Sequence, residues 1–285
     1  MTIDSNAAPR LRVHWAGRSV VGCVRTNNED ALWAGALAGG SGPGEIKDDT
    51  EGDGVLARPG AVLAVADGMG GAKAGEVASE LAVTILSEEM LQRAAKGVDG
   101  DADAIAEAFV GAVEIANERI RDESAVNPAR RGMGTTLTAV WVYDRTAQIV
   151  HVGDSRAYLF RKGRLARLTK DQSLVEKLLE DNIITEEEAQ RMGARNIILQ
   201  ALGSEEDLEV AQPRNELEAG DMLVLCTDGL TGVVPDEDVE EILRAGGSLE
   251  ETCQRLIDAA EAAGGPDNIT VLVGRIEPEH SAPNA

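Results

Sequence analysis

Residues 61–75 read AVLAVADGMGGAKAG, and the expected architecture can be built outward from this stretch. The apolar run at 62–66 predicts a buried strand, because it is too short for a helix. The run stops at Asp67, which is followed by Gly68, and a helix is expected to begin near Glu76. A carboxylate at a strand end, beside a glycine that lets the backbone come close, is suited to holding a hard cation or a phosphate.

An aspartate follows two further apolar runs, at Asp154 and Asp228, and Asp267 comes just before another, at 269–273. Strands that pack in one core bring their ends to a shared rim, so these aspartates and Asp67 are expected to converge. Each aspartate alone could instead be purely structural. An Asp-Gly pair is typical of a turn, and Asp154 and Asp267 also suit an ordinary strand-end cap and turn.

The chain has 285 residues, of which 43% are hydrophobic, and this suits a sizeable core. No run of about 18 apolar residues occurs, so no membrane-spanning segment is expected. Its net charge is −23, from 50 acidic against 27 basic residues. A chain this acidic would repel nucleic acid and anionic lipid surfaces, so neither is an expected partner.

Three cysteines, Cys23, Cys226 and Cys253, lack the spacing of a metal or redox site. Each lies in an apolar context, so all three are expected to be reduced core residues. Residues 1–9 lack the pattern of a signal peptide. The sequence therefore predicts a cytosolic protein, and its three histidines, His14, His151 and His280, disfavour a zinc site.

Strand and helix patterns come in clusters rather than in strict alternation, which favours a layered antiparallel α+β domain over a parallel sheet. Strands are predicted at 19–24, 31–34, 62–66, 135–143, 147–152, 157–161, 165–168, 221–227 and 269–276. Helices are predicted at 75–96, 103–121, 236–245 and 249–263.

A single domain is expected over 13–276, with a flexible tail at 1–12 and a polar tail at 277–285. The segment 35–60 is rich in Gly, Asp and Pro and is expected to be an exposed insertion between strands. Two short helices are predicted within 171–200. That segment is interpreted as a flap over a site, and a helical hairpin that merely packs fits the same pattern.

The strand-end aspartates offer oxygen ligands without a set of His or Cys, which suits Mg²⁺ or Mn²⁺ rather than zinc or copper. Gly68 can add its carbonyl oxygen, because no side chain blocks the approach. Two cations that share one carboxylate lower the pKa of a bridging water and make it a nucleophile aimed at phosphorus. Arg25 offers a planar fork of donors for phosphate oxygens, although a lone arginine is more often a surface ion-pair partner.

Other catalytic classes find little support. Ser155 and His151 do not form a recognisable nucleophile pair, and no Gly-rich loop precedes a Lys-Ser/Thr pair. The residues alone therefore indicate an acidic site for divalent cations and leave its substrate open.

Seven motifs, in order, resemble the protein phosphatase 2C family, the metal-dependent serine/threonine protein phosphatases, in its bacterial form. They are RTNNED at 25–30, VADGMGG at 65–71, GMGTT at 132–136, HVGDSR at 151–156, LTKD at 168–171, TDGL at 227–230 and DNIT at 267–270. The resemblance covers the chain from about Val20 to Ile276. It implies a central antiparallel β-sandwich flanked by helix pairs on both faces, in α-β-β-α layers, with a helical flap.

The resemblance also implies a role for each strand-end acid. Asp67 would bridge two cations, with the Gly68 carbonyl on one of them. Asp228 and Asp267 would complete the other. Asp154 matches the position that, together with that of Asp228, holds a third cation in bacterial members.

Three residues of the first motif receive roles in the same way. Glu29 and Asp30 would act mainly through cation-bound waters. Arg25 matches the arginine that binds the phosphate, so Arg25 and Asp67 are the expected catalytic residues.

The implied activity is hydrolysis of phosphoserine and phosphothreonine in proteins, with Mn²⁺ or Mg²⁺, by a hydroxide that bridges two cations and without a phosphoenzyme. The implied partners are phosphoproteins, namely a serine/threonine kinase and its substrates, and a monomer is expected. Two alternatives stay open, a pseudophosphatase that only binds phosphoproteins and a phosphatase of small metabolites.

Two departures from the family pattern concern proton donation and the flap. Met69 stands where animal members carry a histidine proposed as the acid for the leaving group, as in many bacterial members. Gln172 stands where many bacterial members have a histidine. The second departure affects substrate handling more than cation binding.

Overall fold

The strand predicted at 62–66 is an interior strand of a sheet in the computed structural model. The structure describes residues 10–38, 49–70, 74–97, 100–191, 197–204 and 207–279. This strand, β4 (Ala61–Met69), pairs antiparallel with β2 (Asp30–Ala36) and with β6 (Leu137–Tyr143). Every residue from Ala61 to Ala66 is fully buried, because the strand is covered on both faces. It continues past the predicted end, through Asp67.

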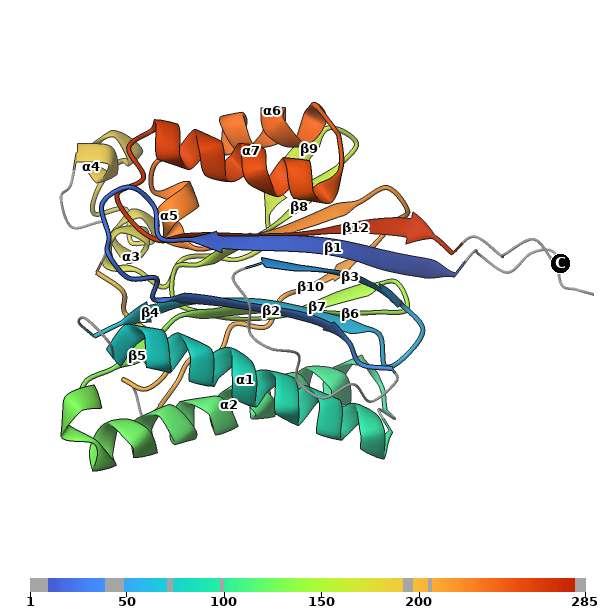
Figure 1. Cartoon of the computed structure of the whole chain (residues 1–285), viewed down its shortest axis with the longest axis horizontal. Coiled ribbons are helices and arrows are strands. Elements are labelled where there is room, and N and C mark those ends of the chain that lie inside the picture. The colour runs from blue at the N-terminus through green and yellow to red at the C-terminus, as the bar shows by residue number, and fades with distance from the viewer. Residues whose placement is uncertain are drawn as a thin grey trace, which may run out of the picture.

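Two antiparallel sheets pack face to face (Figure 1). The other strands are β1 (Leu11–Val20), β3 (Asp49–Val55), β5 (Gly134–Thr135), β7 (Thr146–Val152), β8 (Arg156–Arg161), β9 (Arg164–Arg167), β10 (Arg214–Glu216), β11 (Met222–Cys226) and β12 (Ile269–Pro278). One sheet has the order β10-β7-β6-β4-β2, with β5 paired to β4, and the other has the order β3-β1-β12-β11-β8-β9.

Helices cover the outer face of each sheet (Figure 1). The long helices α1 (Ala74–Lys96) and α2 (Ala102–Val126) lie on the first sheet, and α5 (Asp228–Thr231), α6 (Asp236–Arg244) and α7 (Leu249–Ala262) lie on the second. The predicted α-β-β-α sandwich is therefore confirmed.

The core has one apolar cluster between each pair of adjacent layers. Under α2, the Phe109 ring meets Trp141 edge-on at 5.8 Å between centroids. Between the sheets, Leu63 and Leu225 belong to one buried cluster, and Gly274 leaves room for Leu63, since a Cβ there would stand 3.0 Å from the Leu63 Cδ2. These clusters hold the strand ends in fixed positions at the rim.

Two short helices, α3 (Leu174–Glu180) and α4 (Glu186–Arg191), lie at the end of the sandwich where β4 ends, on the left in Figure 1. Ser173 caps α3 by accepting a hydrogen bond from the backbone N–H of Glu176. The turn between β1 and β2 and the short helix α5 lie at the same end. The chain reverses at this end repeatedly, so residues distant in sequence meet there.

Two expectations about the first strands were wrong. The strand predicted at 19–24 is β1, which begins at Leu11 and ends at Val20, so the predicted tail at 1–12 is too long. Its buried side chains alternate with partly exposed ones, from Leu11 through Val13 to Trp15, which is the period of a strand. Residues 1–9 lie outside the described part of the chain.

Two further predicted boundaries were wrong. The segment 35–60, predicted as an exposed loop, contains the end of β2 and the strand β3, and the C-terminal tail predicted from residue 277 begins after β12. β2 continues to Ala36 and β3 pairs with β1. Glycines suit this edge strand because Gly52 lies against the Trp15 ring, where a Cβ would stand 2.7 Å from a ring carbon. Strand β12 continues to Pro278, where it pairs with Leu11.

Two of the three cysteines match the expectation. Cys226 and Cys253 are buried free thiols, but Cys23 is exposed, because it lies in the turn after β1 rather than in a strand. In the described ranges, no helix combines the length and the hydrophobicity needed to cross a bilayer.

Replacing Leu63 by Ala should lower the free energy of unfolding by about 2–5 kcal/mol, because it opens a cavity between the two sheets. Urea denaturation measures this change. Leu178→Ala is the matched control, since Leu178 is only half-buried on α3 and its truncation should cost less than about 1 kcal/mol. Equal losses in the two variants would contradict this view of the core.

Candidate active site

The strand-end aspartates converge at one rim of the sandwich. Strand pairing sets Asp30 at the start of β2 directly opposite Asp67 in β4. Burial raises the pKa of Asp67 well above its usual value, and the carboxylates of Asp30, Asp228, Asp154 and Asp267 raise it further. Because these acids act on one carboxyl group, the predicted convergence is confirmed.

Asp30 is a buried carboxylate with one bonded and one unbonded oxygen. Its Oδ2 accepts hydrogen bonds from the Thr227 hydroxyl at 2.8 Å and the Thr270 hydroxyl at 2.7 Å. Its Oδ1 is buried without a hydrogen-bond partner among the described residues. Burial, partly offset by these two bonds, raises the pKa of Asp30 to about 7.

Asp154 and Asp228 have the same incomplete bonding. Each has a buried Oδ1 without a hydrogen-bond partner in the described part of the chain. Burial and then the charge of Asp228 raise the pKa of Asp154 to about 7. Burial and then Asp267 raise the pKa of Asp228, whereas a hydrogen bond from Asp67 lowers it.

These residues fit divalent cations. Among the described residues, no three His, Cys, Asp or Glu side chains are arranged so that they alone could hold a metal ion. Mg²⁺ and similar cations do not require one, since they keep several waters as ligands. The unbonded oxygens of Asp30, Asp154 and Asp228 need a positive partner, because a buried charge without one is costly. An oxygen-only set of this kind suits Mg²⁺ or Mn²⁺.

Gly68 and Glu29 add oxygens on the α1 side of the site. The backbone N–H of Gly68 donates to the Glu29 carbonyl at 3.0 Å. A Cβ built on Gly75, in the first turn of α1, would stand 2.8 Å from both the Gly68 carbonyl oxygen and the Glu29 Oε2. The missing side chain at Gly75 therefore leaves an oxygen-lined space. We did not single out Gly75 from the sequence, although it ends the stretch at 61–75.

Arg25 lies at the exposed side of the acids. Its side chain is 52% exposed and its Nη2 donates to the Asp267 Oδ2 at 2.8 Å. This bond raises the pKa of Arg25, so the guanidinium stays charged and its remaining N–H groups are directed by Asp267. Glu29 also faces this charge, and burial raises the pKa of its carboxyl group while Arg25 lowers it.

Asn268 holds the loop that carries Arg25 and Glu29, a role we did not predict from the sequence. Its Oδ1 accepts the backbone N–H of Glu29 at 2.8 Å. Its Nδ2 donates to the carbonyls of Val21 at 3.0 Å and Asn27 at 2.8 Å. The motif Asp-Asn at 267–268 was a signal for this function, because an Asn amide can satisfy several backbone groups at once.

Ser155 and His151 have structural partners instead of each other. The Ser155 hydroxyl bonds the Thr136 hydroxyl at 2.7 Å, and Thr136 in turn accepts the backbone N–H of Asp67 at 2.9 Å. His151 bonds Thr138 at 2.8 Å and the Lys170 carbonyl at 2.9 Å, and burial lowers its pKa to about 4. These side chains position Asp67 and its neighbours, and they leave no nucleophile pair.

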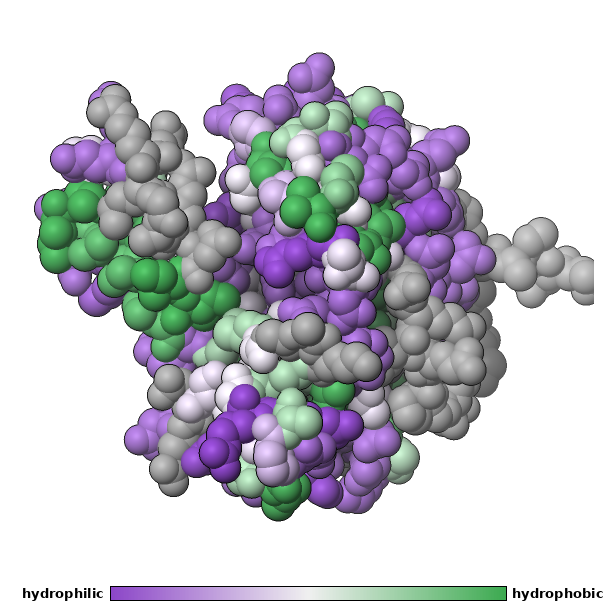
Figure 2. Space-filling model, turned by 60° about the vertical axis from the view of Figure 1, so that its left-hand side comes forward, coloured by the Kyte–Doolittle hydropathy of each residue, from purple (hydrophilic) through white to green (hydrophobic). Residues whose placement is uncertain are grey.

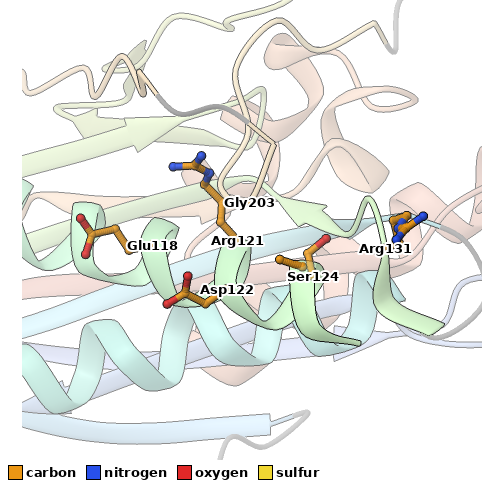
Figure 3. A pocket seen from close by; sticks show the side chains of 7 residues that line it. Glu118, Arg121, Asp122, Ser124, Arg131 and Gly203 are labelled. Carbon is orange, nitrogen blue, oxygen red and sulfur yellow. The ribbon is translucent and has the colours of Figure 1, made fainter. Parts of the chain in front are cut away.

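A hollow of about 720 Å³ lies away from these acids, along the C-terminal part of α2 (Figure 3). The Ser124 hydroxyl in its wall accepts the backbone N–H of Gly132 at 3.0 Å. It is lined by Glu118, Arg121, Asp122, Ser124, Ala125, Arg131 and Gly203. Its two acids and two arginines balance in charge, and it contains none of the predicted site residues.

The fold and the site define an α-β-β-α protein with an acidic centre for divalent cations. Comparison with known families agrees, since the family model for protein phosphatase 2C matches residues 44–266. The chain therefore belongs to the protein phosphatase 2C family, in its bacterial form.

Curated relatives are consistent with this membership. The chain is 39% identical to the serine/threonine protein phosphatase PstP of Mycobacterium tuberculosis over 93% of its own length, and it spans 45%, about half, of the length of that protein. It is 40% identical to the serine/threonine phosphatase stp of Listeria monocytogenes, over 74% of this chain and 83% of that protein.

A solved structure shares the fold. The catalytic domain of the serine/threonine protein phosphatase PstP in complex with two manganese ions superposes with a TM-score of 0.75. The two chains are 36% identical, and the match covers 94% of this chain and 99% of that one.

Replacing Asp154 by Asn should stabilise the cation-free protein at pH 8 by roughly 1–3 kcal/mol, and less at pH 5. The folded-state pKa of Asp154, about 7, lies above the usual 3.8. The stability from its protonated form is therefore complete at low pH and is lost as the pH rises through about 7. Urea denaturation with chelator measures the effect.

The exposed acid Asp122 provides the control for this pH dependence, because Asp122→Asn should change stability by less than about 0.5 kcal/mol at either pH. If Asp154→Asn gave no more stabilisation at pH 8 than at pH 5, the raised pKa of Asp154 would be refuted.

Replacing Gly75 by Ala should weaken Mn²⁺ binding roughly tenfold, because its Cβ would crowd the Gly68 carbonyl and the Glu29 carboxylate that line the site. Isothermal titration calorimetry measures the affinity. Gly111→Ala is the matched control, since a Cβ there meets only the Arg93 side chain, at 3.6 Å. Unchanged affinity in Gly75→Ala would exclude this oxygen-lined space from cation binding.

Proposed function

We propose that this chain is a protein-serine/threonine phosphatase that depends on Mn²⁺ or Mg²⁺. The observation that carries the proposal is the set of buried carboxylate oxygens beside Asp67, those of Asp30, Asp154 and Asp228, that lack a hydrogen-bond partner among the described residues. Membership of the protein phosphatase 2C family and relatives named serine/threonine phosphatases support it.

Each acid of the site receives a role. Asp67 would hold two cations, with the Gly68 carbonyl beside one of them and with Asp228 and Asp267 at the other. Bound there, the cations would supply a nucleophilic water and offset charge on the phosphate. The hydroxyls of Thr135 and Thr136 hold the Asp67 backbone, at 2.9 Å each, so its carboxylate keeps its direction.

The remaining site residues would act around the two cations. Glu29 and Asp30 would hold waters bound to the cations, because Mg²⁺ keeps several waters as ligands. Asp154, with Asp228, would hold a third cation. Arg25, directed by Asp267, binds the phosphate oxygens through its free N–H groups.

No covalent phosphoenzyme is required. Ser155 is bonded to Thr136, and His151 is held by Thr138 and Lys170, so neither side chain is available as a nucleophile or its base. Residue 69 is Met, so it provides no proton for the leaving group. That proton therefore comes from water in the site.

The proposed substrates are phosphoproteins, among them a serine/threonine kinase and the targets of that kinase. The chain acts as a monomer in the cytoplasm. The free thiols of Cys226 and Cys253 support a reducing compartment.

With Mn²⁺, the protein should hydrolyse para-nitrophenyl phosphate and a phosphothreonine peptide, and chelator should abolish both reactions. Asp228→Asn should lower kcat at least about a hundredfold, because it removes one charge from the cation site. Asp238→Asn, which changes an exposed acid on α6, is the matched control and should retain wild-type kinetics.

Two other results would identify the alternatives. Mn²⁺ binding by calorimetry without any turnover would replace the enzyme by a phosphoprotein-binding protein. Faster turnover of sugar phosphates than of a panel of phosphopeptides would replace the protein substrate by a small metabolite.

A further inference from the structure

A cleft of about 680 Å³ lies beside the acidic centre, between α3 and the segment that carries α5 and the start of α6. Asp154 and Asp228 line it, so the cleft is continuous with the proposed cation site. The Oδ1 of Asp154, a residue only 7% exposed, has no partner within the described ranges. The cleft therefore extends from the reaction centre toward α3 and α6.

The charge of the cleft is negative even without those two aspartates. Its lining includes four other carboxylates, at Asp171, Glu176, Asp236 and Glu237, against the guanidinium groups of Arg156 and Arg167. This surplus of acids disfavours an anion and favours a cationic group.

Both arginines are already paired with the same acid. Arg156 donates to Asp171 through Nε at 3.0 Å and through Nη2 at 2.7 Å, and the Arg167 Nη2 lies 2.5 Å from the Asp171 Oδ1. Glu237 is exposed and has no hydrogen-bond or ion-pair partner in the described part of the chain. Its carboxylate is thus free to meet an incoming charge.

The α3 side of the cleft presents two apolar side chains beside Glu176. Val175 and Leu179 stand four residues apart on α3, so they share one face, and both line the cleft. No residue of α3 is buried, although four of its seven residues are apolar. Figure 2 shows hydrophobic residues gathered on the protruding left side of the molecule. Ile183, in the turn after α3, is 64% exposed.

We propose, resting on the proposed phosphatase function, that this cleft binds a basic side chain of the substrate, a Lys or Arg close in sequence to the phosphorylated residue. The aliphatic stem lies on Val175 and Leu179, and the cationic head meets Glu237. Long basic side chains combine these two requirements, because their stems are apolar and their ends are charged. Because the cleft extends to Asp154 and Asp228, a basic residue bound in it lies next to the phosphate of the substrate.

Stabilisation of the α6 N-terminus does not by itself account for the position of Glu237 in the cleft. Asp236, Glu237 and Asp238 all lie in the first turn of α6, where acids stabilise the helix N-terminus. Glu237 lines the cleft, whereas Asp238 does not. Asp238 is therefore a matched control, with the same helix turn, the same exposure and the same charge.

The test uses phosphothreonine peptides in which one Arg is scanned through the flanking positions, each compared with its Gln counterpart. Hydrolysis of para-nitrophenyl phosphate, which has no flanking residue, is the reference for every variant. The wild type should prefer Arg over Gln at one position at least. Glu237→Arg should lower kcat/KM for that Arg peptide about fivefold relative to the reference. Asp238→Arg should retain the wild-type ratio.

A second readout requires no turnover. Fluorescence anisotropy of the labelled phosphopeptides, in buffer with chelator, should show the same preference for Arg and the same loss in Glu237→Arg. Leu179→Ser should weaken binding of the Arg peptide more than Leu178→Ser, because Leu178 does not line the cleft.

Three results would overturn this inference: no Arg preference at any position, an equal effect of Glu237→Arg and Asp238→Arg, or equal binding of the Arg and Gln peptides. Failure of the proposed function gives a different result. In that case the Arg preference persists in the anisotropy measurement while neither peptide nor para-nitrophenyl phosphate is hydrolysed, which supports the cleft and refutes the enzyme.

Discussion

Repulsion among buried carboxylates is the constraint on which the rest of this structure depends. Asp67 lies among Asp30, Asp154, Asp228 and Asp267, and burial together with their charges raises its pKa well above the usual value. Without a counterion, such a cluster would favour protonation or separation of the strand ends. The apolar clusters between the layers resist that separation. The fold thus provides the stability that keeps an unfavourable cluster in place, and divalent cations remove its cost.

Hydrogen bonds to one oxygen of Asp30 and to the backbone of Asp67 determine which carboxylate oxygens remain free to bind a cation. Thr227 and Thr270 donate to one oxygen of Asp30, and the other has no hydrogen-bond partner in the described part of the chain. Thr135 and Thr136 bind the backbone of Asp67, not its carboxylate. The hydroxyl groups therefore orient the acids without neutralising them, as expected where the charged oxygens must bind another group.

The sequence was sufficient to predict where the acids meet, because each of the four aspartates stands beside an apolar run that forms a strand. It also predicted the layers, since the apolar residues of α2 and α7 recur at helical spacing and are the ones that the sheets bury. Gly75 and Asn268 were missed because their roles depend on neighbours in space, Glu29 above all. The start of β1 was missed because residues 1–12 were assigned to a tail, although Leu11, Val13 and Trp15 alternate with polar residues. Strand β3 was missed because Gly52 in an edge strand is explained only by the Trp15 ring that covers it.

The most direct test of this account is the position of the cations in crystals grown with Mn²⁺ and measured at its absorption edge. Two anomalous peaks about 3.5–4 Å apart should lie on either side of the Asp67 carboxylate. One should be close to the Gly68 carbonyl and the other between Asp228 and Asp267. An absence of peaks, or Mn²⁺ bound at this rim without a contact to Asp67, would contradict the claim that the buried carboxylates exist to hold a cation pair.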